Sequence, residues 1–164
     1  MIDPTLTGLD RLHAALAAID LAAEIVHPGV PMPTVPLAAA AVGTSAEAII
    51  KTVVFVDDQG HTIVAIANGT SRINRTLLAT AIGVDKVRLA DSVAVLERTG
   101  YPAGGVSPIG IRDEATRIVI DSGVLVQTDV YGGAGTEDDL IHLSVPDLLQ
   151  VTRGLVADIV DSAV

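Results

Sequence analysis

The chain reads Lys51-Thr-Val-Val-Phe-Val56, then Asp57-Asp-Gln-Gly60, then His61-Thr-Ile-Val-Ala-Ile-Ala67. Its two apolar runs are rich in β-branched residues, which favours strands, and the polar segment between them is short enough for a tight turn. The stretch therefore predicts a β-hairpin. Neither alternating face of the first strand is polar, so we expect this strand to be covered on both sides.

Helical and strand patterns of uneven length surround the hairpin. One helix is predicted to begin after Ser71 and to stop at Gly83, and a C-terminal helix to run from Ser144 to about Asp161. Such a mixture predicts an α+β domain rather than a regular βαβ array. The length of 164 residues, without a repeat or a linker, predicts a single domain over residues 1–164. Further strands are expected at residues 23–27, 86–89, 116–120, 129–131 and 140–143.

The composition of the chain limits the classes of function that it can have. A formal net charge of −10 argues against nonspecific binding along a nucleic-acid backbone, and aromatic residues at 2% offer few stacking platforms for bases. The sequence has no cysteine, which excludes disulfides, thiolate metal sites and a cysteine nucleophile. Its apolar runs are too short to span a bilayer and no signal peptide is visible. We therefore expect a cytoplasmic protein without a membrane partner.

Titratable residues show no metal-site or acid-pair pattern. The four histidines are widely separated and lack metal-ligand spacing, so neither a metal nor another cofactor is predicted. The acidic pairs Asp57-Asp58 and Asp138-Asp139 are interpreted as solvated turn charges rather than as paired catalytic acids.

The most unusual stretch is Gly100-Tyr-Pro-Ala-Gly-Gly-Val-Ser-Pro-Ile-Gly110. Four glycines and two prolines cannot continue a helix or a strand, so the segment is either a surface turn or a fixed wall of a ligand site. It lacks the Gly-Lys-Ser/Thr ending of a P-loop and a dinucleotide fingerprint. The role that we favour is for Gly104 and Gly105 to present backbone N–H groups to a carbonyl or an oxyanion.

Ser107 suggests a competing interpretation. The run Gly105-Val-Ser107-Pro-Ile-Gly110 resembles the nucleophile elbow of a serine hydrolase, but its spacing is one residue too long. It follows the end of a predicted helix, and Pro108 is badly placed for the required turn into a helix. A serine esterase is therefore disfavoured.

Two other features leave alternatives open. Lys51 enters a strand that is apolar on both faces, so its ammonium either reaches solvent at the strand end or meets an anion in a pocket. The second glycine cluster, Gly132-Gly-Ala-Gly135, is either a simple turn or a segment that approaches the first glycine loop closely.

Taken in order, several residues and motifs resemble the YbaK/prolyl-tRNA-synthetase-associated editing domain family. The resemblance extends from about Leu9 to about Ile159, and the ordered set is specific although no single motif is. The set comprises Thr34 before an Ala-rich helix, Ile50-Lys51-Thr52, Gly100-Tyr101, Gly104-Gly-Val-Ser-Pro108-Ile-Gly110, Asp121 and Gly133-Ala-Gly135.

The resemblance implies a mixed, barrel-like β-sheet surrounded by helices. It also implies trans-editing hydrolysis of mischarged tRNA, typically tRNA for proline that carries alanine, cysteine or another small residue. A synthetase is a possible further partner. The alternative is a non-catalytic module of the same fold that binds a tRNA end, a nucleotide or a synthetase.

The resemblance also implies the site. Its pocket would receive the 3′ aminoacyl-adenosine of the tRNA. Lys51, Gly104 and Gly105 would carry catalysis through a fixed charge and backbone amides. The predicted substrate-binding residues, including the Thr34 bend and the Asn68 turn that would set the pocket volume, are Thr34, Asn68, Ser107, Pro108, Gly133, Ala134 and Gly135.

Overall fold

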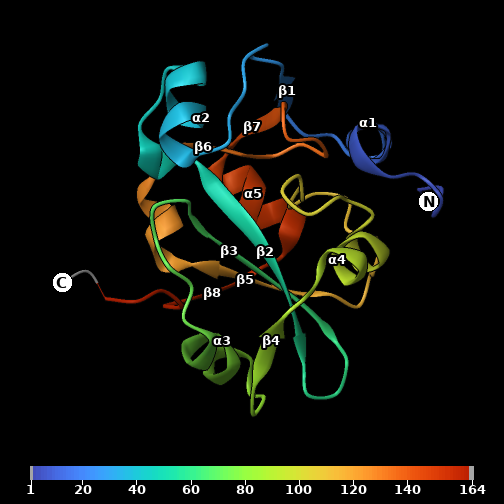
Figure 1. Cartoon of the computed structure of the whole chain (residues 1–164), viewed down its shortest axis with the longest axis vertical. Helices are drawn as coiled ribbons and strands as arrows, with labels where there is room; N and C mark the ends of the chain where they lie inside the picture. The colour runs from blue at the N-terminus through green and yellow to red at the C-terminus, as the bar shows by residue number, and fades with distance from the viewer. Residues whose placement is uncertain (1, 163–164) are drawn as a thin grey trace.

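The computed structural model describes residues 2–162, and its strands form two sheets (Figure 1). The larger sheet has the strand order β4-β2-β3-β5-β8. Its members are β2 (Ile50–Asp57), β3 (Thr62–Asn68), β4 (Val87–Leu89), β5 (Arg117–Asp121) and β8 (Leu155–Ala157). The smaller sheet has the order β1-β7-β6, with β1 (Glu24–Val26), β6 (Asp129–Gly133) and β7 (Leu140–Ser144).

Helices lie around these two sheets (Figure 1). They are α1 (Gly8–Ala17), α2 (Val35–Val42), α3 (Arg75–Ile82), α4 (Ser92–Thr99) and α5 (Val145–Thr152), with the 3₁₀ turns η1 (Ala46–Ala48) and η2 (Ser122–Val126). The prediction of a mixed α+β fold is confirmed. The described strands do not close into a barrel, because the sheets meet through a bridge between Ile49 and Tyr131 rather than through a continuous ladder.

The predicted hairpin is confirmed and lies in the middle of the larger sheet. Strands β2 and β3 pair in antiparallel register, with Val54 opposite Val64. Asp57 holds the turn between them, since its Oδ1 accepts hydrogen bonds from the amides of Gln59 and His61, both at 2.9 Å. The prediction that Asp57 is a solvated turn charge is wrong, because Asp57 is buried and only 5% of its surface is exposed. The Asp57 carboxylate thus accepts hydrogen bonds from two turn amides that have no backbone partner among residues 2–162.

Both faces of the hairpin are buried, as its apolar pattern predicts. Val54, Val64 and Ile66 pack into one core cluster together with residues of the glycine loop. On the opposite face, Phe55 and Ile63 pack against α3 in a second cluster. Each fully buried aliphatic side chain contributes roughly 1.5–3 kcal/mol. The hairpin therefore forms part of both cores.

Two helix boundaries differ from the prediction. Helix α3 begins after Asn74, not Ser71, and the Asn74 side chain accepts a hydrogen bond of 3.0 Å from the amide of Leu77. The prediction that the last helix reaches Asp161 is wrong, because α5 ends at Thr152. The chain then turns at Gly154 and adds β8 to β5 in parallel. Backbone pairing at the sheet edge outweighs the local helical pattern there.

The Asp57 turn predicts a pH-dependent contribution to stability. Burial raises the pKa of Asp57, but hydrogen bonds from the His61 and Gln59 amides and from the His61 ring outweigh it, so the pKa lies below its ordinary value. A carboxylate whose folded pKa is lowered stabilises the fold above its unfolded pKa of about 3.9 and loses that effect as the pH falls further.

We therefore expect Asp57→Ala to lower the melting temperature at pH 7 and to lower it less at pH 3. Thermal denaturation followed by circular dichroism at both pH values measures the difference. Asp58→Ala is the matched control, because its exposed side chain has no hydrogen bond in the described part of the chain. An equal loss at both pH values would contradict the role of the ionised carboxylate.

Candidate functional site

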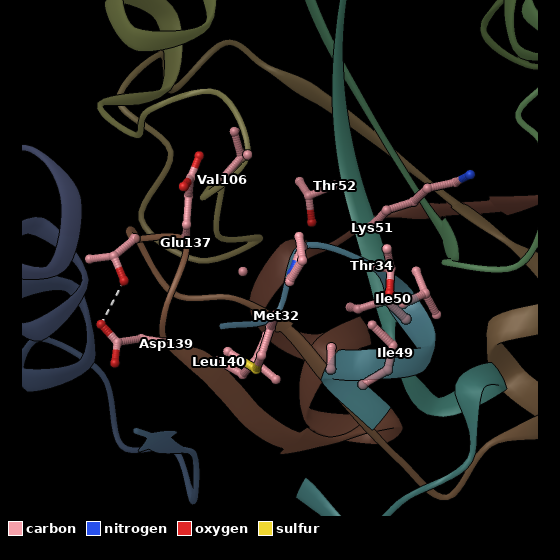
Figure 2. Close-up of a pocket in the computed structure, with 16 residues that line it drawn as sticks. Met32, Thr34, Ile49, Ile50, Lys51, Thr52, Val106, Glu137, Asp139 and Leu140 are labelled. Atoms are coloured by element: carbon pink, nitrogen blue, oxygen red, sulfur yellow. Dashed lines mark hydrogen bonds between the residues drawn. The ribbon is translucent and has the colours of Figure 1, made fainter. Parts of the chain in front are cut away.

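A cavity of about 250 Å³ opens between the start of β2, the segment before α2 and the two glycine segments (Figure 2). Four stretches that lie far apart in the sequence supply its walls. The lining residues are Met32, Pro33, Thr34, Val35, Ala38, Ile49, Ile50, Lys51, Thr52, Gly104, Val106, Gly133, Thr136, Glu137, Asp139 and Leu140.

The two glycine segments lie side by side, which resolves the open interpretation of the second cluster. The Gly135 amide donates a hydrogen bond of 2.8 Å to the Gly105 carbonyl oxygen. A Cβ at Gly133 would lie 2.2 Å from the Val106 carbonyl oxygen, and a Cβ at Gly105 would lie 3.0 Å from the Thr136 amide nitrogen. Only glycine allows backbones to approach so closely. Ala134 between them is fully buried.

Buried polar groups fix the rest of the first loop. The Tyr101 hydroxyl donates a hydrogen bond of 2.6 Å to the Ile109 carbonyl oxygen, and burial raises the pKa of this hydroxyl. Ser107 is fully buried, and its Oγ accepts a hydrogen bond of 3.2 Å from the Ile109 amide. Ser107 and Pro108 thus belong to the buried part of the loop and do not line the cavity. They support the loop residues that form the cavity wall.

The amides of the loop differ in whether they are free. The Gly105 N–H donates to the Pro102 carbonyl oxygen at 3.0 Å, so this group is engaged within the loop. The N–H groups of Gly104 and Val106 have no hydrogen-bond partner among residues 2–162. Both residues line the cavity, and Gly104 has a left-handed φ of +87°. The donors available to a ligand are therefore at positions 104 and 106.

Lys51 contributes to the cavity wall, but its ammonium points away from the cavity (Figure 2). Strand alternation places its side chain on the face opposite Ile50 and Thr52. There Nζ donates to the Ser71 carbonyl oxygen, in a second depression that Arg72 and Arg75 also line. Burial lowers the pKa of this lysine. The cation thus lies beside the cavity and not inside it.

Thr34 and Asn68 occupy different places. Thr34 lines the cavity and caps α2, with its Oγ1 accepting from the Leu37 amide at 3.3 Å. Asn68 is not among the lining residues, and its buried Oδ1 has no partner in the described chain. Thr52, which sequence reasoning did not select, does line the cavity and has a buried hydroxyl oxygen without a partner.

Sequence reasoning also missed the wall formed by residues 136–140. The Thr136 hydroxyl donates to Asp139 Oδ2 at 2.6 Å, and the His27 ring bonds the other carboxylate oxygen. Burial raises the pKa of Asp139, but these two hydrogen bonds outweigh it and the pKa lies below its usual value. The prediction of a solvated charge is wrong for Asp139, whose side chain is 12% exposed. The Thr-x-x-Asp spacing was the signal that could have revealed it.

Residues 2–162 contain neither a metal-binding cluster nor a membrane-spanning helix. No group of three or more His, Asp or Glu side chains there could hold a metal ion. No helix in the same residues is long and apolar enough to cross a bilayer.

The sequence profile described as the aminoacyl-tRNA editing domain matches residues 30–151, which include every residue that lines the cavity. The chain belongs to this family. A solved chain described as a candidate trans-editing enzyme for prolyl tRNA synthetase superposes on the editing domain with a TM-score of 0.85 at 27% identity, covering 99% of this chain and 100% of that chain. A crystal structure of a hypothetical protein gives a TM-score of 0.83 at 32% identity, covering 92% and 99%.

Curated relatives are longer proteins. The proline–tRNA ligase of Maridesulfovibrio salexigens is 32% identical over 140 residues, which cover 85% of this chain and 23% of the ligase. The proline–tRNA ligase of Nitratidesulfovibrio vulgaris is 32% identical over 129 residues, which cover 79% of this chain and 20% of the ligase. The editing domain therefore spans less than a quarter of the length of these two relatives.

The backbone contact between the glycine segments predicts a large cost for a single methyl group. Gly133→Ala should destabilise the fold by about 2–3 kcal/mol, because the Val106 carbonyl must move. Gly83→Ala is the control: it lies at φ +73° with open space around its Cβ, and backbone strain alone costs about 1 kcal/mol. Urea denaturation measures both, and equal losses would contradict the contact.

Proposed function

We propose that this editing domain hydrolyses the ester bond of mischarged aminoacyl-tRNA in trans. One observation carries the proposal: a small cavity is walled by the free backbone amides of Gly104 and Val106. A cavity of about 250 Å³ suits a small aminoacyl group. The preferred substrates are alanine or cysteine on tRNA for proline, in keeping with the proline–tRNA ligases that resemble this chain.

In this mechanism the Gly104 and Val106 amides donate hydrogen bonds to the ester carbonyl oxygen. They stabilise the negative charge that develops on this oxygen as water attacks the carbonyl carbon, with the proton of the water taken up by a group of the substrate itself or by solvent. The acyl carbon–oxygen bond then breaks and the ribose oxygen of the terminal adenosine takes up a proton. An aminoacyl ester is already activated, so positioning and electrostatics can suffice without a protein nucleophile.

Other polar groups would position the substrate. The unpartnered Thr52 oxygen can accept a hydrogen bond from the amino group of the aminoacyl moiety. Lys51 supplies a fixed positive charge at the adjoining depression, toward the terminal phosphate or ribose. Gly105, with its amide engaged, acts through the shape of the loop.

A synthetase is the proposed partner. The net charge of −10 limits the affinity that the editing domain alone can have for a tRNA backbone. Action beside a prolyl-tRNA synthetase would supply the remaining affinity.

The second candidate is a non-catalytic module that binds a tRNA end, a nucleotide or a synthetase. The direction of the Lys51 ammonium, away from the cavity and toward Ser71, favours it. Binding of aminoacyl-tRNA without multiple turnover would distinguish this module from an enzyme.

The amide donor is tested at Gly104. Gly104→Ala introduces strain at φ +87°, which displaces the N–H group, and we expect the rate of deacylation of alanyl-tRNA for proline to fall by about 100-fold. Gly83→Ala carries similar strain far from the cavity and should retain the wild-type rate. Release of radiolabelled alanine gives the rates. Full activity in Gly104→Ala would contradict the donor role.

The role of the Lys51 charge is tested by comparing alanine substitutions of the two lysines in the sequence. Lys51→Ala should lower kcat/KM about tenfold and reduce the dependence of log kcat/KM on log salt by about one unit, as expected for one lost phosphate contact. Lys86→Ala, an exposed lysine outside both depressions, should change neither quantity. Undiminished hydrolysis by Lys51→Ala would rule out its role.

A further inference from the structure

We propose that the His27–Asp139 pair is a clasp that holds the proline-rich bend, residues 27–34, over the cavity and so determines which amino-acid side chains fit. This proposal rests on the proposed function, since it concerns the selectivity of the same cavity. His27 and Asp139 act as positioning residues. Neither is assigned a part in breaking the ester bond.

The clasp lies where a strand ladder ends. Strands β1 and β7 pair with Val26 opposite Leu140, so His27 and Asp139 are the next opposed positions of the same register. The His27 ring bonds the Asp139 carboxylate there. Pro28 follows at once and has no N–H group with which to continue the ladder. The side-chain pair thus replaces the missing backbone pairing at the point where the two segments diverge.

The His27–Asp139 pair is the polar contact between the bend and the wall formed by residues 136–140. Among residues 2–162 no other hydrogen bond joins residues 27–34 to that wall. Instead, a hollow of about 340 Å³ separates Pro31, Met32 and Pro33 from the opposite wall at Gly104 and Glu137. The bend is therefore joined to the wall of residues 136–140 by one polar contact and by the apolar packing of Met32 in the cluster that also contains Leu140.

The Asp139 side of the clasp is fixed. Asp139 accepts the hydrogen bond from Thr136, marked in Figure 2, and Thr136 adjoins the glycine segment that packs on Gly105. The His27 side chain, by contrast, is 56% exposed. Loss of the pair would accordingly release the bend and leave the glycine wall in place. Met32 and Pro33, which line the cavity from the bend, would then move outward.

The test compares His27→Ala with wild type in the full chain. The probes are two non-hydrolysable adenosines with a 3′-amide link, one to alanine and one to valine, and calorimetry gives their Kd values. In His27→Ala we expect the valine-to-alanine ratio of Kd to fall about tenfold, because a wider cavity accepts the larger side chain.

Two further variants test whether the effect is specific to the His27–Asp139 pair. His27→Gln keeps a side-chain donor within reach of Asp139 and should restore the wild-type ratio. His61→Ala removes another exposed histidine that pairs with an aspartate, at the hairpin turn, and should leave the ratio unchanged.

The outcomes separate the clasp from the proposed reaction. An unchanged Kd ratio in His27→Ala overturns the clasp. Wild type that binds both probes but hydrolyses no aminoacyl-tRNA overturns the proposed reaction alone, and the Kd ratio still tests the clasp. Wild type that binds neither probe overturns both.

Discussion

The contact between the backbones of the two glycine segments is the constraint on which the cavity depends. Gly133 lies against the Val106 carbonyl, and Gly135 donates to Gly105 from the neighbouring segment. A Cβ at Gly133 would lie 2.2 Å from the Val106 carbonyl oxygen and would force the two segments apart. The wall is therefore made of main chain, and main-chain amides at fixed positions suit the recognition of a carbonyl group rather than of a particular side chain.

The central hairpin forms another wall of the cavity. It also separates the cavity from the depression that Arg72 and Arg75 line. Because both faces of β2 are covered, adjacent side chains along the strand face different parts of the protein. Thr52 faces the cavity, whereas Lys51 faces the depression that Arg72 and Arg75 also line. One strand thus places a cation one residue away from a side chain of the cavity lining. Under the proposed function, the aminoacyl group and the phosphates of a tRNA end would lie on opposite sides of this strand.

Local patterns failed where distant segments compete for the backbone. The C-terminal helix ends at Thr152 because β5 offers an open edge that β8 can pair with. The pair His27–Asp139 was not predicted, since its members are 112 positions apart and each looks like an ordinary turn residue. Asp57 was misassigned for the opposite reason: its partners are adjacent in sequence, but its burial results from the sheet around it.

The sequence by itself determined the hairpin, its burial on both faces, the α+β class and the irregular glycine segments. These follow from side-chain size and from φ restrictions, which act between near neighbours. The tertiary structure alone decided that the two glycine segments touch, that Gly104 and Val106 rather than Gly105 have free amides, and that the Lys51 ammonium lies outside the cavity. Those outcomes depend on which backbones approach one another through space, and no local preference specifies that.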